Sequence, residues 1–304
     1  LKAETSYNQL TEDSSNPKLA ATFADRWEIS GGELGVALVL SDQTRRIVAE
    51  NNETGGWGEE APNNDYEMRF YDLERERSGI VLNLDFVSDA GNTYYAHLFH
   101  NEYTDTEWRA KWETRDGLED NDPVINGSVF SYANSRVDTE GKNRTEIRQI
   151  DSAQIGAKFE INDRSGLEIE FFTSRAEQDD TQSYNAIFRS GKVNQPITYD
   201  ATDSRKPTVT FPAAFYNAQS FNLKAWESDY SLNTDENTGA TLDYRYAYSN
   251  NTEFQTGVKF SAREKINNFN FCAYEPINDV NLAEVKNLSL SPFLSTKAGP
   301  TPTF

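Results

Sequence analysis

Apolar and polar side chains alternate through residues 240–262, with one interruption at the polar cluster SNNTE, residues 249–253. Successive side chains of a β-strand point to opposite faces, so each run places its apolar side chains on one face. A cluster of Ser, Asn and Thr between two such runs is typical of a hairpin turn. The pattern predicts a hairpin with one shared apolar face, formed by Ala240, Leu242, Tyr244, Tyr246, Tyr248, Phe254, Thr256, Val258, Phe260 and Ala262.

The same alternation recurs at 34–40, 80–86, 153–161 and 167–173. The apolar face of each segment carries no charged residue, although 26% of the chain is charged. The opposite faces hold the ions, among them Asp85, Lys158, Glu160, Glu168, Glu170, Asp243, Arg245 and Lys259. We therefore expect a large antiparallel sheet with one ion-free face.

About nine strands are expected, near 1–9, 18–28, 33–48, 67–86, 93–114, 143–161, 166–188, 219–248 and 253–272. Short clusters of turn-forming residues at 30–32, 88–92, 162–166 and 249–253 join consecutive strands, whereas long polar segments at 51–65, 115–128 and 190–207 join the others. Aromatic residues gather beside the short turns: Trp27, Phe86, Tyr94, Tyr95, Phe159, Tyr246, Tyr248 and Phe254. Short turns at one rim, long loops at the other and an aromatic girdle are typical of outer-membrane barrels. In 68–79 and 101–117 the strands continue beyond the apolar stretch, with charges expected on both faces.

Composition narrows the class of protein. The 304 residues have a net charge of -20, 37% hydrophobic and 12% aromatic residues, and a mean hydropathy of -0.75. Disordered chains are poor in aromatics, so this polarity indicates an ordered β protein, and the acidic balance disfavours a nucleic-acid partner. The single cysteine, Cys272, excludes an internal disulfide framework.

Two fold classes satisfy the alternation. An antiparallel transmembrane β-barrel would turn its apolar face to lipid, and a soluble β-sandwich would cover that face with a second sheet. The unequal connections and the aromatic clustering favour the barrel. Bacterial single-chain barrels have an even number of strands, so about nine up-and-down strands predict part of a larger barrel.

Two phrases carry a family resemblance. RFYDLERERSGIVLNLDF at 69–86 and YYAHLFHNEYTDTEWR at 94–109 resemble the barrel strands of proteobacterial TonB-dependent outer-membrane receptors, and 4–27 with 32–41 resemble their first three strands. The resemblance implies a 22-strand barrel, a plug domain that this chain does not contain, and a location in the bacterial outer membrane. It divides the chain into a partial barrel with long outer loops at 1–272 and a loop or irregular segment at 273–304. The partners that it implies are outer-membrane lipid, a nutrient ligand, and TonB with ExbB and ExbD acting through the plug.

The resemblance also assigns candidate site residues. Residues facing the lumen and the plug would be Arg75, Arg77, Lys158, Glu168, Glu170, Asp243, Arg245 and Lys259; the alternative is that they pair with one another across strands. Outer loops and upper strand walls would bind the ligand, through Trp57, Trp108, Arg109, Trp112 and Arg115. Aromatic faces stack on sugars or aromatic chelators, and guanidinium groups bind carboxylates, but ordinary packing is the alternative for each residue.

The sequence contains no recognisable motif for enzymatic chemistry. His97 and His100 are the only histidines, lack zinc-site spacing and are expected to lie on opposite faces of one strand. The acidic loop DGLEDND at 116–122 does not follow the order of ligands in an EF-hand. We therefore expect no enzyme activity, no metal site and no cofactor.

Three functions stay open. The first is a receptor that imports a ferric siderophore, an oligosaccharide, cobalamin or a similar nutrient with energy from TonB. The second is a passive porin-like channel, and the third is a soluble or surface-attached β protein that binds carbohydrate.

Overall fold

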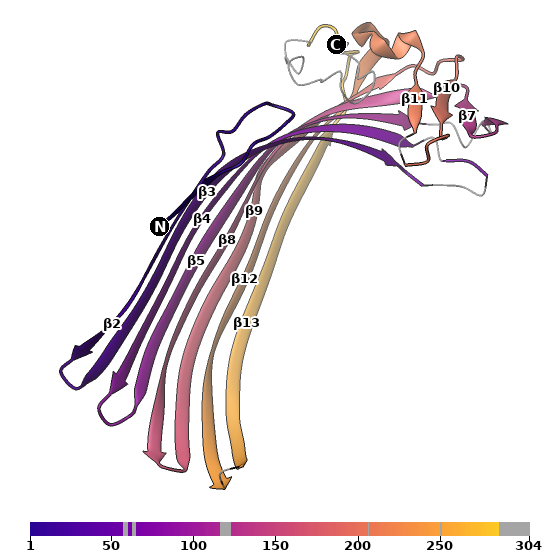
Figure 1. Ribbon diagram of the computed structural model, residues 1–304. Helices are drawn as coiled ribbons and strands as arrows, with labels where there is room; N and C mark the ends of the chain where they lie inside the picture. The colour runs from indigo at the N-terminus through magenta and orange to yellow at the C-terminus, as the bar shows by residue number, and fades with distance from the viewer. Residues whose placement is uncertain (57–59, 63–64, 116–122, 206, 250, 286–304) are drawn as a thin grey trace.

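The computed structural model describes residues 1–56, 60–62, 65–115, 123–205, 207–249 and 251–285. Its main feature is a nine-stranded antiparallel sheet of very long, curved strands (Figure 1). In spatial order the strands are β1 (Lys2–Thr5), β2 (Pro17–Ile29), β3 (Gly32–Thr54), β4 (Tyr66–Ser88), β5 (Thr93–Arg115), β8 (Arg136–Asn162), β9 (Ser165–Ser190), β12 (Phe221–Ser249) and β13 (Thr252–Tyr274).

The nine strands follow one another up and down, as the alternation predicted. Short turns join β2 to β3, β4 to β5, and β8 to β9 at one end of the sheet (Figure 1). In the β4–β5 turn the amide of Ser88 donates to the carbonyl of Asn92 at 2.8 Å, and Gly91 has a φ of +83°, a conformation that a side chain would strain. Turn chemistry and strand alternation therefore specify this end of the sheet together.

The register places the predicted apolar residues on one face of the main sheet, here called the apolar face. Residues directly opposite each other in a ladder share a face. One such row crosses eight strands, from β2 to β13. Each of its residues lies directly opposite the next: Phe23, Leu38, Leu82, Leu98, Ala153, Thr173, Thr238 and Ala262. The neighbouring rows toward the short turns add Leu84, Ile155, Phe171 and Phe260, and we call these rows the apolar band. On β2 the band has an exception, because Asp25 lies opposite Val36.

A row of ionisable side chains borders the apolar band on the side away from the short turns. His100, Asp151, Arg175, Glu236 and Glu264 lie opposite one another in register across β5, β8, β9, β12 and β13. The band therefore ends abruptly, within a single row of residues.

A second, four-stranded sheet lies at the opposite end from the short turns (Figure 1). It consists of β6 (Val124–Asn126), β7 (Val129–Tyr132), β10 (Ile197–Asp200) and β11 (Thr208–Thr210), and two 3₁₀ helices, η1 (Ala213–Tyr216) and η2 (Ala218–Ser220), follow it. β6 and β10 lie in segments predicted as long loops, at 115–128 and 190–207, and β7 and β11 follow those segments, where no strand was predicted.

The hydrophobic core of the described residues lies where this small sheet covers the apolar face. Tyr66, Trp112, Val137 and Phe188 come from the main sheet, and Tyr132, Ile197, Tyr199, Val209, Phe211, Phe215 and Phe221 are buried with them. The ring of Trp112 lies 5.5 Å from that of Phe211 and 6.2 Å from that of Phe221. The small sheet thus protects one end of the apolar face and leaves the apolar band outside the core.

The fold is all-β and antiparallel, as expected. In the part of the chain described, β1 and β13 stand at the two ends of the main sheet and no ladder joins them. Closure into a barrel of 22 strands stays a prediction. Among the described helices, none has the length and apolarity needed to cross a membrane.

Candidate functional site on the polar face

All eight residues predicted to face the lumen lie on the face of the main sheet opposite the apolar face, here called the polar face. Along its strand, each alternates with residues of the apolar face. The eight are Arg75, Arg77, Lys158, Glu168, Glu170, Asp243, Arg245 and Lys259. The register therefore brings them to one side of the sheet, spread over β4, β8, β9, β12 and β13.

Most of these residues contact polar-face neighbours. Lys158 lies 3.2 Å from Glu168, Arg75 lies 3.2 Å from Asp105, and Arg245 forms an ion pair with Glu160. Glu170 accepts a hydrogen bond from the hydroxyl of Tyr95 at 2.8 Å. Arg77 and Lys259 lie over aromatic rings, 5.0 Å from the centre of Tyr103 and 5.1 Å from that of Phe172. Pairing on the polar face is thus an observed role, and contact with a plug or a solute stays a prediction.

The densest set of charges on the polar face lies near the small-sheet end and centres on Lys111. Its ammonium nitrogen lies 2.9 Å from Glu113, 3.1 Å from Glu140 and 3.9 Å from Glu67. Arg109 adds a 2.6 Å contact to Glu140. The side chains of Glu113 and Glu140 are only 5% and 7% exposed, so these carboxylates are buried among their cationic partners.

The same network extends across β5, β8 and β9. Arg115 lies 2.7 Å from Glu113 and 3.6 Å from Asp138. Arg189 donates two hydrogen bonds to Asp138, at 2.7 and 2.6 Å, in the bidentate geometry that favours arginine over lysine. We call the set Glu67, Arg69, Arg109, Lys111, Glu113, Arg115, Asp138, Glu140 and Arg189 the charge ladder.

Burial and pairing set the protonation states in the charge ladder. Burial opposes the charge of Lys111, but the hydrogen bond to Glu113 and the attraction of Glu140 and Glu113 outweigh it and raise the lysine pKa. Burial likewise acts to raise the pKa of Glu140, but Lys111 and Arg109 overcome it and lower that pKa. Both residues therefore stay ionised in the neutral pH range, and the ladder presents fixed charges of both signs.

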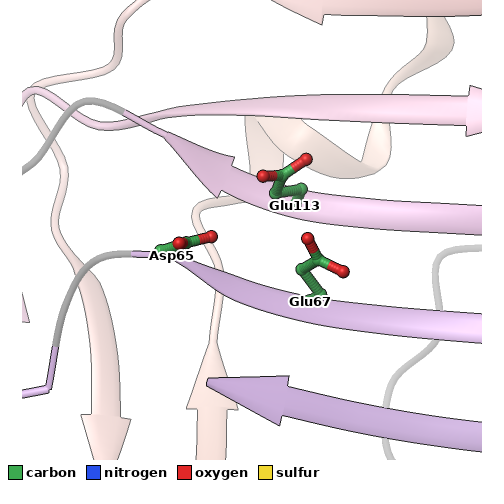
Figure 2. Close-up of side chains that lie close together, drawn as sticks. All are labelled: Asp65, Glu67 and Glu113. Atoms are coloured by element: carbon green, nitrogen blue, oxygen red, sulfur yellow. The ribbon is translucent and has the colours of Figure 1, made fainter. Parts of the chain in front are cut away.

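Three carboxylates at the edge of the ladder lie close enough to consider a metal ion. Figure 2 shows Asp65, just before β4, with Glu67 on β4 and Glu113 on β5. One oxygen of each lies within 4.8 Å of the others. Lys111 and Arg115 contact Glu113, and Arg69 contacts Glu67. Because these cations already compensate Glu67 and Glu113, the geometry supports an ion-pair network better than a metal centre.

The predicted ligand-binding residues do not gather at one place. Trp57 lies outside the described residues, as does the acidic loop 116–122. Trp108 and Trp112 are on the apolar face, where Trp108 is 37% exposed and Trp112 is buried in the core. Arg109 and Arg115 belong to the charge ladder on the opposite face, so the described arginines and tryptophans do not form one pocket.

Sequence reasoning missed Lys111, Glu113, Asp138, Glu140 and Arg189. The signal was present in β5, where Glu107, Arg109, Lys111, Glu113 and Arg115 follow one another with a period of two. The expectation of charges on both faces holds in β5 through Glu102, which lies on the apolar face, whereas the charged side chains of residues 103–115 all face the polar side. It holds in β4 as well, where Asp72, Glu74 and Glu76 lie on the apolar face.

Two smaller expectations concern the aromatic girdle and the histidines. Phe86, Tyr94 and Phe159 lie on the apolar face with ring centres 6.2 and 5.9 Å apart, but Tyr95 was assigned wrongly, because it points to the polar face. His97 and His100 lie on opposite faces, as predicted. His100 contacts Asp151 at 2.7 Å, and His97 lies 3.7 Å from Asp85.

The comparisons with known proteins identify no family. No family model matches the chain, and no significant match was found among curated proteins or solved structures.

Proposed function

We propose that this chain forms part of the wall of a transmembrane β-barrel in the bacterial outer membrane, and that the barrel is a receptor that imports a nutrient. The observation that carries the proposal is the apolar band. It crosses the main sheet and remains exposed: Ile155 and Phe171, both on interior strands, are each 55% exposed. No other described element covers the band.

Exposure of this extent requires a covering partner. Water is a poor solvent for a continuous apolar surface, and monomeric soluble proteins rarely expose large apolar patches. A β-sandwich would cover the band with a second sheet, but the only second sheet in the described chain lies over the far end of the strands. Lipid hydrocarbon is therefore the covering that we propose.

The height of the band fits a bilayer. Its longest run, residues 254–262, is about 26 Å long at a rise of about 3.3 Å per residue. At a strand tilt of about 40° this corresponds to a height of about 20 Å, close to the ~25 Å apolar belt of outer-membrane barrels. Aromatic residues at the short-turn border and the ionisable row at the other border would lie at the two interfaces with water.

The receptor function rests on the polar face and on the sequence resemblance. In this proposal the polar face lines the interior, where fixed charges of both signs contact a polar solute or a plug. The resemblance to TonB-dependent receptors supports energised uptake through TonB, ExbB and ExbD, with a ferric siderophore, an oligosaccharide or cobalamin as the kind of nutrient. No described feature favours the passive channel over the receptor.

The membrane part of the proposal is tested by placing a charge on each face. In the intact barrel protein that contains this chain, Ile155→Lys puts an ammonium on the apolar band, where we expect a cost of about 2–4 kcal/mol for folding into vesicles. Ser152→Lys puts the same group on the polar face of the same strand and is the matched control. Equal folding of both variants into vesicles, or a wild-type barrel protein that stays monodisperse without detergent, would contradict the proposal.

The receptor part is tested by uptake in cells that carry the natural gene product. We expect nutrient accumulation to require TonB, ExbB and ExbD, and to stop when any of the three is deleted. Uptake that continues at the same rate without TonB would indicate the passive channel instead.

A further inference from the structure

Three arginines of β3 and β4 lie close together on the polar face: Arg45, Arg75 and Arg77. Arg45 lies directly opposite Arg75 in the β3–β4 ladder, and Arg77 is two residues from Arg75 along β4. Directly opposite residues have Cβ atoms about 5 Å apart, and residues two apart on one strand are about 7 Å apart on the same face. We call these three residues the arginine cluster. It lies outside the charge ladder, on the side nearer the apolar band.

The arginine cluster has one carboxylate for three guanidinium groups. Arg75 donates to Asp105 at 3.2 Å, whereas Arg45 and Arg77 form no ion pair within the part of the chain that the structure describes. The acidic residues that alternate with Arg75 and Arg77 along β4 point to the opposite face. The cluster and its carboxylate therefore have a net charge of about +2, because guanidinium groups stay protonated. This local surplus occurs in a chain whose net charge is -20.

Neighbouring side chains do not remove the surplus. One register row of the polar face passes through Lys18, Arg77 and Arg148 and adds two cations. Lys18 lies 3.8 Å from Glu4, and Arg148 lies 2.6 Å from Glu146. These two carboxylates thus already have cationic partners, so they leave the charge of the arginine cluster uncompensated.

The cluster is held in position from one side and open on the other. The hydroxyl of Tyr103 donates to Asp105 at 2.9 Å, and this carboxylate, whose side chain is 6% exposed, accepts from the Nε of Arg75. Arg77 lies 5.0 Å from the centre of the Tyr103 ring. Arg45 and Arg77 are exposed, and Arg75 keeps four of its five N–H donors for other partners. Guanidinium groups with unused donors bind carboxylate and phosphate oxygens in pairs.

The register makes the cluster costly when it is empty. Like charges directly opposite each other on two strands are destabilising, and Arg45 and Arg75 form such a pair. On the other face of the same two strands the charges are complementary, since Arg46 lies opposite Glu74. An anion bound between the guanidinium groups would replace their mutual repulsion with attraction.

We propose that the arginine cluster binds a small solute with at least two negative charges on carboxylate or phosphate groups. Two negative charges match the net charge of the cluster, and the oxygens would accept from the unused N–H groups of Arg45, Arg75 and Arg77. That this anion is the imported nutrient, or a part of it, rests on the proposed function, in which the polar face lines the interior. The cluster lies beyond the border of the apolar band on the side of the long loops, where a solute from outside would arrive first.

The experiment uses the intact barrel protein that contains this chain, purified in detergent micelles. Calorimetric titrations at low ionic strength use citrate, inorganic phosphate and, as a neutral probe, glucose. We expect citrate or phosphate to bind, with an affinity that falls as sodium chloride is added, and glucose to give no heat of binding. The comparison of citrate with phosphate tells which kind of oxyanion the cluster prefers. Binding of neither anion would overturn the inference.

Two variants locate the anion, and a third is the control. Arg45→Gln and Arg77→Gln each remove one exposed guanidinium group, and Arg263→Gln removes an exposed arginine of the polar face that is paired with Asp235. We expect each cluster variant to bind the anion about tenfold more weakly, the equivalent of one charge-assisted contact, and Arg263→Gln to bind it as wild type does. Equal affinity in wild type and both cluster variants would overturn the inference.

The outcomes separate the anion site from the proposed function. A barrel protein whose folding into vesicles is sensitive to Ile155→Lys, but which binds neither anion, would refute the anion site and leave the proposed function standing. A protein that binds the anion through Arg45 and Arg77, but folds equally well with Ile155→Lys and Ser152→Lys, would refute the membrane location and leave the anion site standing.

Discussion

Lys111 on β5 and Glu140 on β8 form a buried ion pair, with 3.1 Å between the ammonium nitrogen and a carboxylate oxygen and side chains only 13% and 7% exposed. The β5–β8 register places Lys111 directly opposite Glu140. Each group compensates the charge of the other, and a buried charge left without its partner would be costly. Arg109 and Glu113 complete the compensation on either side. The pair is therefore the part of the charge ladder at which removal of one residue has the largest expected effect.

The first prediction is that Lys111→Met lowers the free energy of unfolding by about 2–3 kcal/mol. The substitution leaves Glu140 and Glu113 with fewer cations, and breaking a fully buried pair costs ~3–5 kcal/mol. We expect a smaller loss because Lys111 keeps some exposure to solvent. Urea titration in detergent micelles, followed by tryptophan fluorescence, measures the change.

The control is Arg263→Met on β13. Arg263 also forms a bidentate pair, with Asp235, but the arginine side chain is 66% exposed. Exposed pairs contribute little, so no measurable change is expected. Similar losses in the two variants would show that burial does not determine the strength of these pairs.

The second prediction concerns pH. The pKa of Glu140 is lowered from its ordinary value of 4.5, so its contribution to stability is complete above pH 4.5 and is lost as the pH falls below it. The pKa of Lys111 is raised from 10.5, so its contribution is complete below pH 10.5 and is lost as the pH rises above it. We expect thermal stability to be level between these limits and to fall on both sides.

The variant Lys111→Met serves as the check on this pH profile. It removes the alkaline loss that belongs to Lys111, and it weakens the acid loss because Arg109 alone then lowers the pKa of Glu140. Melting temperatures measured across the pH range give both slopes. Profiles of the same shape for wild type and variant would contradict the assignment.

The long strands could be predicted from the sequence because one physical constraint acts on every second residue. Each of the nine strands of the main sheet overlaps a predicted segment, and the turn at Ser88–Asn92 has the expected residues. The small sheet could not be predicted in this way. Its strands are three or four residues long, too short for alternation to show, and β7 pairs with β10 across more than sixty residues of chain.

For the candidate site, the sequence predicts which face of the sheet each residue lies on, but not which residues contact one another. Alternation assigned Lys158, Glu168 and Arg245 to the polar face, because the face on which a residue lies depends only on its odd or even position along its own strand. Which residues contact each other depends on the register between strands that are distant in sequence. The contact of Lys111 with Glu140 requires the β5–β8 ladder, and no local pattern specifies that ladder.

The third prediction is that two tyrosines under the small sheet ionise late. Burial raises the pKa of Tyr132 to about 12, and burial is also the largest cause of the raised pKa of Tyr199. Because the ordinary value is 10.0, the stability that these neutral hydroxyls contribute is complete below pH 10 and is lost as the pH rises toward 12. Tyrosinate absorbance in the near ultraviolet measures the titration.

Tyr132→Phe tests this assignment. The variant keeps the buried ring, which lies 5.3 Å from that of Tyr199, and removes the hydroxyl that donates to the carbonyl of Pro62. We expect one tyrosine fewer among those that ionise well above pH 10. The absorbance change of the exposed tyrosines near pH 10 should be the same as in wild type. Ionisation of all tyrosines in one step near pH 10 would show that the small sheet does not exclude water from them.

The fourth prediction separates the two tryptophans of β5, which lie on the same face four residues apart. Trp112 packs against Phe211, Tyr216 and Phe221, whereas Trp108 is 37% exposed. Trp112→Ala removes a large buried side chain and should cost about 3–5 kcal/mol of local stability. The loss should be confined to the small sheet and the 3₁₀ helices that rest on Trp112.

Hydrogen exchange with peptide resolution measures this local effect. In Trp112→Ala we expect faster exchange in 129–132 and 197–216, with the strands of the apolar band unchanged. Trp108→Ala is the control and should leave both regions as in wild type. If the two variants exchanged alike, Trp112 would not anchor the small sheet, and the covering of the apolar face at that end would have to depend on the remaining core residues, such as Tyr66 and Phe188.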